Sequence, residues 1–213
     1  PLEGYSVTLP GDGNGTFGPP AAYVNSARTA YAHTRDVVVG DFNGDTWPDY
    51  IVSNPVGQAV AVFFNNHDGT FTRRAREMWL PGNVASLATG DFNGDGKLDL
   101  AFITASDTTY GNTGPGNNVG VVDGNGDGTF GTLRTDLGPL DIVSDVRIYS
   151  ARPAGDTLVR PSSRLVAHDM DGNGTLDLVF LAEPMQGLYD VLSILRGAGN
   201  GTSILLRSRR TAT

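Results

Sequence analysis

Three copies of one nine-residue loop constrain the fold of this chain more than any other feature. The copies read DFNGDTWPD from Asp41, DFNGDGKLD from Asp91 and DMDGNGTLD from Asp169, and all follow D-x-[DN]-x-[DN]-x-x-x-D. Recurrence of one loop indicates a repeat architecture, in which each copy belongs to one supersecondary unit. Turns favour the same residue types, but three copies that end in aspartate at the same ninth position are difficult to explain as turns alone.

Short apolar runs on both sides of each loop predict β-strands, because they are rich in β-branched and aromatic residues. The runs before the loops are 37–39, 87–89 and 165–167, the runs after them are 50–52, 100–103 and 178–181, and third strands are predicted at 59–64, 118–122 and 190–195. A second motif alternates with the loops and reverses the chain into a fourth strand. It reads GDGNGTFG from Gly11, NHDGTF from Asn66, GNGDGTFG from Gly124 and GAGNGTS from Gly197.

The spacing of the loops predicts how the chain is divided. The first two loops begin 50 residues apart, which is a plausible length for a propeller blade of four strands, and the third begins 78 residues after the second. We expect an all-β chain, a β-propeller of four-stranded antiparallel blades. It contains three and a half blades: an outer half-blade in 1–30, blades in 31–83, 84–137 and 164–213, and an insertion at 138–163. Since closure needs at least about four blades, we expect a fragment, an open array, or a subunit that completes its ring or self-associates with another chain.

The loops offer the oxygen ligands that calcium prefers. Side chains at positions one, three, five and nine and the backbone carbonyl at position seven would form each site. We expect three Ca²⁺ sites: Asp41, Asn43, Asp45, Trp47 and Asp49; Asp91, Asn93, Asp95, Lys97 and Asp99; and Asp169, Asp171, Asn173, Thr175 and Asp177.

Backbone conformation ranks these sites. We predict positive φ angles at Gly94 and Gly96, which let the second loop wrap tightly. Thr46 stands where the other loops have glycine, and a β-branched residue is unfavourable in left-handed geometry. We therefore expect the first site to be the weakest.

Other metal chemistries fit the loops less well. An EF-hand requires flanking helices and a glutamate at position twelve, where this chain has Val52, Phe102 and Phe180 in apolar runs. Magnesium demands strict octahedral geometry and retains its water, and zinc would lack its usual His and Cys ligands. The segment from Asp123 resembles a fourth loop, but its ninth position is Gly131, so we predict a turn there.

Charge and composition limit the partners. The net charge is −8, and removing the nine loop carboxylates leaves +1, so the acidity is local. The sequence has no basic stripe with interleaved aromatic residues, so it does not predict nucleic-acid binding. The longest apolar runs are too short for a transmembrane helix. The chain contains no cysteine, which excludes a disulfide framework and a thiolate metal site. It begins at Pro1 without an initiator Met, which we interpret as a processed, trimmed or excised product.

The three loops and the GTF turns resemble the FG-GAP/VCBS repeat family, which includes the propeller of integrin α subunits and certain lectins. The matching motifs extend over nearly the whole chain except 138–163. The resemblance implies calcium at the loop positions named above and an extracellular location. It implies no sugar-binding residues, because no motif in this chain corresponds to them.

Three functions follow as hypotheses. The first is a secreted binding module for glycans or protein surfaces, in which Trp47, Trp79, Tyr31 and Tyr110 stack on sugars or, alternatively, pack between blades. The second is part of a carbohydrate-active enzyme, although no pair of carboxylates is spaced for acid–base catalysis, and His168 before the third loop is the best histidine candidate. The third is a structural or assembly subunit.

Overall fold

The computed structural model describes residues 5–25, 34–54, 58–80, 82–105, 119–131, 164–182, 191–199 and 205–210. These residues form fourteen β-strands and no helix. The strands make several antiparallel sheets, so the all-β prediction is confirmed. The predicted insertion at 138–163 lies outside the described residues, and among the described residues no helix has the length and hydrophobicity needed to span a membrane.

The first two strands form a hairpin by themselves. Strand β1 (Tyr5–Thr8) pairs with β2 (Ala21–Val24) from Tyr5↔Val24 to Thr8↔Ala21, around the first GTF turn. The next sheet contains β3 (Val37–Gly40), β4 (Asp49–Asn54), β5 (Ala59–Asn65) and β6 (Phe71–Arg73) in sequence order. Strands β3, β4 and β5 lie where the apolar runs predict them.

The first complete sheet differs from a simple four-stranded blade in its outermost strand. Strand β7 (Met78–Trp79) also pairs with β5, at Ala59 and Val60, whereas β6 pairs with the other end of β5, at Phe63–Asn65. Since β4 occupies one edge of β5, β6 and β7 lie on its other edge. They form two short pieces of one interrupted outer strand.

Two further sheets follow. One is described as β8 (Asn83–Gly90), β9 (Asp99–Ala105) and β10 (Val119–Val122), and the last contains β11 (Val166–His168), β12 (Asp177–Ala182), β13 (Val191–Arg196) and β14 (Leu205–Arg210). Strand β8 has a register shift between Val84 and Ser86. Each nine-residue loop thus joins the first two strands of its sheet, which excludes the helices of an EF-hand.

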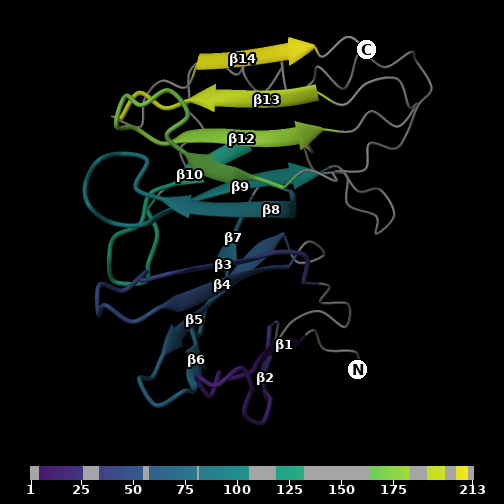
Figure 1. The fold of residues 1–213 in the computed structure, drawn as a ribbon, viewed down its shortest axis with the longest axis vertical. Helices are drawn as coiled ribbons and strands as arrows, with labels where there is room; N and C mark the ends of the chain where they lie inside the picture. Colours follow the sequence, from purple (N-terminus) through teal and green to yellow (C-terminus); the bar gives the residue numbers. More distant parts are fainter. Residues whose placement is uncertain are drawn as a thin grey trace, which may run out of the picture.

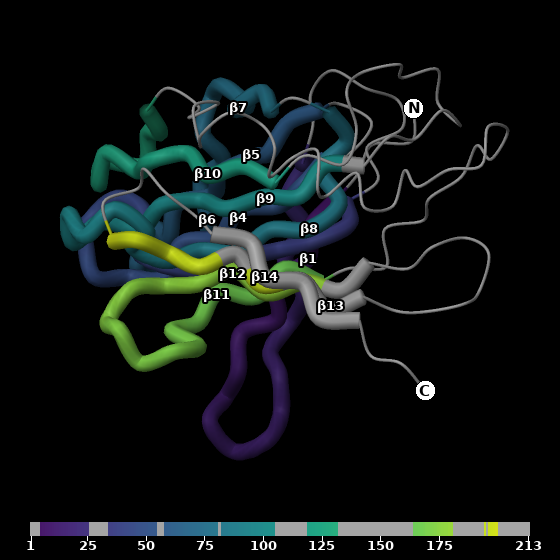
Figure 2. The backbone as a smooth tube through the Cα atoms, turned by 90° about the horizontal axis from the view of Figure 1, so that it is seen from above, coloured from purple at the N-terminus to yellow at the C-terminus, as the bar shows by residue number. Residues whose placement is uncertain are grey.

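The sheets succeed one another along the long axis of the molecule, from β1 and β2 near one end to β14 at the other (Figure 1). Figure 2 shows the β1–β2 hairpin, in purple, projecting beyond the other sheets. Buried apolar side chains fill the space between neighbouring sheets: Ile51 and Val62 meet Leu87 and Phe102 between the first complete sheet and the next. Burial of this kind is the main force that holds such sheets face to face.

Hydrogen bonds also connect the first strands of successive sheets. The Asp36 carboxylate, just before β3, accepts hydrogen bonds from the Ser86 hydroxyl (2.7 Å) and from the Leu87 amide (2.8 Å) of β8. The Ser86 hydroxyl oxygen in turn accepts a hydrogen bond from the Leu165 amide (2.9 Å), just before β11. Residues 36 and 86 precede their loops by the same five positions, so the connection repeats along the stack.

Candidate metal-binding loops

The first aspartate of each loop organises the backbone around it. In the second loop, the Asp91 carboxylate accepts hydrogen bonds from the amides of Gly94 (2.7 Å), Asp95 (3.1 Å) and Gly96 (2.8 Å). The same three contacts recur in the other loops, at Asp41 and at Asp169. The loops therefore share one conformation, in which the backbone curls around a carboxylate.

The side chains at positions three and five also face inward along this curl. Asn93 Oδ1 accepts a hydrogen bond from the Asp95 amide (2.8 Å), and Asp95 Oδ1 accepts one from the Lys97 amide (2.9 Å). The third loop repeats the pattern with the residue types exchanged, since it has Asp171 at position three and Asn173 at position five. Asn173 Oδ1 also accepts a hydrogen bond from the Thr175 hydroxyl, whereas the other three of these oxygens have a second lone pair that remains able to bind a cation.

The ninth aspartate has a structural role that the sequence pattern did not reveal. Asp99 is 0% exposed, and its carboxylate accepts one hydrogen bond from the Phe92 amide within the loop and one from the Gly124 amide in the following GTF turn, both at 2.9 Å. Asp49 and Asp177 make the equivalent pairs of contacts. This aspartate thus fastens its loop to the turn of the same sheet, and the only sequence signal for it is the constant ninth position.

Burial changes the acidity of these carboxyl groups. Loss of contact with water raises the pKa of Asp49 and of Asp99, although two backbone amides oppose the rise at each site. At exposed loop positions the pKa moves the other way: a hydrogen bond with His67 lowers the pKa of Asp45, and a hydrogen bond from the Gly174 amide lowers that of Asp169. A cation near either buried carboxyl group, Asp49 or Asp99, would favour the charged form of that group.

The third loop brings three carboxylates together. One oxygen from each of Asp169, Asp171 and Asp177 lies within 4.8 Å of the others. Asp171 also forms an ion pair with Arg196 (2.8 Å). Among the described residues no other group of three acidic or histidine side chains is as close, because Asn43 and Asn93 replace the third-position carboxylate in the first two loops.

The donor set of the loops fits a hard cation. Positions one, three, five and nine present only carboxylate and amide oxygens, which are the ligands of calcium. The structure places Trp47, Lys97 and Thr175 at position seven, where their amides donate to the position-five side chains. Their carbonyls remain predicted ligands.

Thr46 has the strained backbone that the sequence predicted. Its φ is 73°, close to the angles of Gly94 (79°), Gly96 (81°) and Gly174 (84°) in the other loops.

We predict that Thr46→Gly raises the calcium affinity of the first loop, because relief of left-handed strain at a β-branched residue releases about 1–2 kcal/mol. Calorimetric titration checks this result, and the reciprocal Gly96→Thr should weaken the second loop. Equal affinities in both pairs would contradict it.

An aromatic pair covers the first loop. The Trp47 and His67 rings are stacked with their centroids 4.8 Å apart, and His67 Nε2 lies 3.0 Å from Asp45 Oδ2. Trp47 is 45% exposed and Trp79 is 59% exposed, so neither tryptophan is buried in the core. The other two predicted aromatic candidates, Tyr31 and Tyr110, lie outside the described residues.

The segment from Asp123 forms a turn, as predicted. The Asn125 amide donates to the Thr129 carbonyl (2.9 Å), and the Thr129 amide donates to Asp127 (2.8 Å). Its hydrogen bonds match those of the other GTF turns, where Thr70 donates to Asp68. It does not repeat the curl around a first aspartate.

Comparison with known proteins supports the repeat. Residues 41–102, from the first loop to the strand after the second, match the family model described as an FG-GAP-like repeat. No curated protein matches the chain. The family match confirms the resemblance drawn from the loops and turns over this segment, and it extends across the interface between the first two complete sheets.

Proposed function

We propose that this chain is a calcium-stabilised binding module built on the FG-GAP-like repeat, with its sheets arranged as three blades and an outer half-blade of a β-propeller. The observation that carries the proposal is the hydrogen-bonded curl that the three loops share, each lined by oxygen atoms of the kind that bind calcium. In this proposal Ca²⁺ binds at all three loops. The acidic group Asp169, Asp171 and Asp177 supports the same chemistry in the third.

Bound calcium would supply positive charge between carboxylates that otherwise repel one another. The protein residues do the mechanical part: the ninth aspartate connects each loop to the next turn, and the first aspartate fixes the curl. Because most carboxylate oxygens already accept backbone hydrogen bonds, the loops have the features of a structural clamp. We therefore assign the cation to stability and assembly of the sheets.

The binding role is proposed from the family and from exposed aromatic side chains. Trp47, at position seven of the first loop, has one ring face on His67, and Trp79 lies on the outer strand β7. Exposed aromatic rings suit the apolar faces of sugars and the hot spots of protein interfaces. We propose an extracellular module that recognises glycans or protein surfaces.

A glycan array with and without EGTA tests the sugar class, and the absence of any calcium-dependent signal would leave protein surfaces as the target.

Calcium removal should lower the thermal stability of the protein. A ligand that binds only the folded state stabilises it by about 2.7 kcal/mol at a hundredfold excess over its dissociation constant. We expect the unfolding temperature in calcium to be higher than in EGTA by roughly 5–11 °C, at 2–4 °C for each kcal/mol in a chain of this size. Scanning calorimetry in the two buffers checks this result, with magnesium as the control. Identical melting curves would contradict the proposal.

A further inference from the structure

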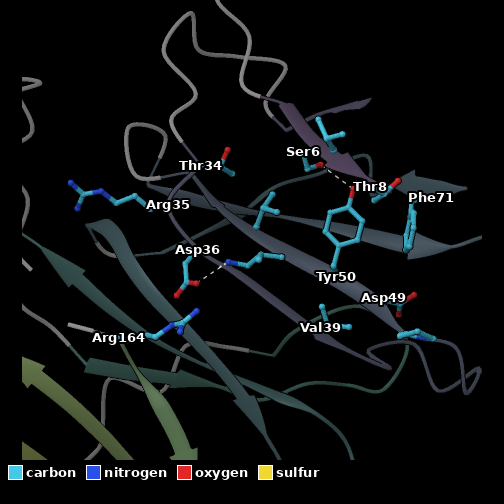
Figure 3. A pocket seen from close by; sticks show the side chains of 14 residues that line it. Ser6, Thr8, Thr34, Arg35, Asp36, Val39, Asp49, Tyr50, Phe71 and Arg164 are labelled. Atoms are coloured by element: carbon cyan, nitrogen blue, oxygen red, sulfur yellow. Dashed lines mark hydrogen bonds between the residues drawn. The ribbon is translucent and has the colours of Figure 1, made fainter. Parts of the chain in front are cut away.

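A groove beside β1 lacks the cover that the equivalent surface of the next sheet has. Its volume is about 640 Å³, and β1, β3 and β4 supply most of its lining, including Val7, Val39 and Tyr50. Figure 3 shows the side chains of Val39, Tyr50 and Phe71 along it. Val37 and Val39 of β3 are 55% and 60% exposed, whereas Leu87, which occupies the position of Val37 in β8, is 3% exposed.

The interface between the first two complete sheets shows what covers such a surface. A Cβ built on Gly40, the residue before the first loop, would lie 2.4 Å from Leu98, at position eight of the second loop. Phe42, at position two of the first loop, lies beside Phe130, which ends the GTF turn of the neighbouring β8–β9–β10 sheet, and the two ring centroids are 6.1 Å apart. The Gly128 amide of that turn donates to the Phe42 carbonyl (2.8 Å).

The groove presents the receiving half of this interface. Pro48 occupies position eight of the first loop and Phe71 ends the GTF turn of the same sheet, and both line the groove. They correspond to Leu98 and Phe130. The groove is continuous with an interface already formed, since Tyr23 of β2 packs against Phe63 and Phe71 on the same face of the sheet.

The β1–β2 hairpin corresponds to the outer part of a sheet, and the described residues do not supply the inner strands. Its GTF turn is the turn that joins the third and fourth strands elsewhere, and β1 pairs with β2 but with no other described strand. At the first glycine of the turns in the last two sheets, an added Cβ would lie 2.0 Å (Gly124) or 2.1 Å (Gly197) from the carbonyl oxygen of Leu98 or Leu176 in the loop. At Gly11, in the same place, it would meet nothing within 4 Å.

We propose that the groove binds a strand–aspartate loop–strand hairpin of the same repeat type, which pairs with the edge of β1 that no described strand occupies and completes its sheet. The inference rests on the blade arrangement of the proposed function. All three hairpins of this type in the sequence are already placed, at β3–β4, β8–β9 and β11–β12. The partner is therefore a fourth hairpin, with glycine before its loop to meet Pro48 and an aromatic ring at position two to meet Phe71.

A synthetic peptide of residues 83–105 is the probe, because it carries the strand, loop and strand of β8 and β9 with Gly90 and Phe92 at the required positions. We expect saturable binding of the fluorescein-labelled peptide to the full chain in calcium, followed by fluorescence anisotropy. The peptide variant Phe92→Ala should bind more than about tenfold weaker, since it lacks the aromatic anchor.

Two protein variants locate the site. Gly11→Ala should leave the melting temperature of the free protein unchanged, because the added methyl group meets open space, and should weaken peptide binding at least about tenfold by obstructing the incoming loop. Val39→Asp should have a similar effect on binding by placing a charge among the apolar side chains that line this part of the groove. Val166→Asp, at an exposed valine of β11, is the matched control and should bind the peptide normally.

Three outcomes overturn the inference: no saturable binding, binding that Gly11→Ala and Val39→Asp leave unchanged, or copy–copy association in light scattering that Val166→Asp abolishes. The last outcome would assign the exposed faces to a second copy of the chain. Failure of the calcium proposal is distinguishable, since it is measured by melting in EGTA without peptide. A calcium effect without peptide binding overturns only the docking.

Discussion

Replacing Asp99 by alanine is expected to destabilise the fold by about 3 kcal/mol, because two backbone amides lose a charged acceptor worth roughly 1.5–3 kcal/mol each and the relief of burying a charge offsets part of that loss. The two amides belong to Phe92 in the loop and to Gly124 in the GTF turn. Their separation in the sequence means that the loop and the turn would lose their connection together. Urea unfolding at constant calcium concentration measures the effect.

Two variants separate this structural role from metal binding. Asp99→Asn retains one acceptor oxygen and should have an intermediate effect. Asp95→Ala removes a predicted ligand whose contacts are confined to the loop, so in EGTA it should change stability by less than about 1 kcal/mol, as loss of an exposed hydrogen bond does. If Asp99→Ala were as mild as Asp95→Ala in EGTA, the fastening role of the ninth aspartate would be wrong.

Gly124→Ala is the second change with a large expected effect. Its Cβ would lie 2.0 Å from the Leu98 carbonyl oxygen and 3.0 Å from the carbonyl carbon, and both are backbone atoms that a side-chain rotation cannot move. We expect a loss of about 3 kcal/mol or more, at the upper end for overpacking, and a melting temperature lower by roughly 6–12 °C.

Gly131→Ala is a matched control for this change. Gly131 ends the same turn, and its nearest contact to an added Cβ is 3.6 Å, so Gly131→Ala should melt within about 2 °C of the parent, as changes of up to 0.5 kcal/mol do. Calorimetry of both variants is sufficient. Equal melting temperatures for Gly124→Ala and Gly131→Ala would show that the loop is not held against the turn as described.

The repeat made much of this fold predictable. The loops, the GTF turns and the apolar runs between them are local signals, and strands β3, β4, β8, β9 and β12 lie where those signals place them. The positive φ of Gly94, Gly96 and Thr46 was predictable for the same reason, since a tight curl leaves those positions few conformations. A local pattern is sufficient when the structure it specifies is also local.

Long-range contacts were not predictable from one sequence. Nothing near Asp36 indicates that its carboxylate receives hydrogen bonds from β8, and nothing near Gly40 indicates that Leu98 packs on it. The interruption between β6 and β7 and the register shift in β8 also depend on neighbouring strands. The ninth-aspartate contacts likewise join a loop and a turn that are far apart in the sequence but belong to one sheet. The contacts of Asp36 and Gly40 and the open groove beside β1 arise only when the sheets are packed face to face.

The number of calcium ions bound per chain tests the central claim most directly. Equilibrium dialysis with metal analysis should find three ions in the parent protein and two in Asp95→Ala, because each loop is proposed to hold one ion with its own oxygen donors. The measurement requires only saturating calcium and an accurate protein concentration. A count of zero in the parent, or the same count in both proteins, would contradict the assignment of the loops as calcium sites.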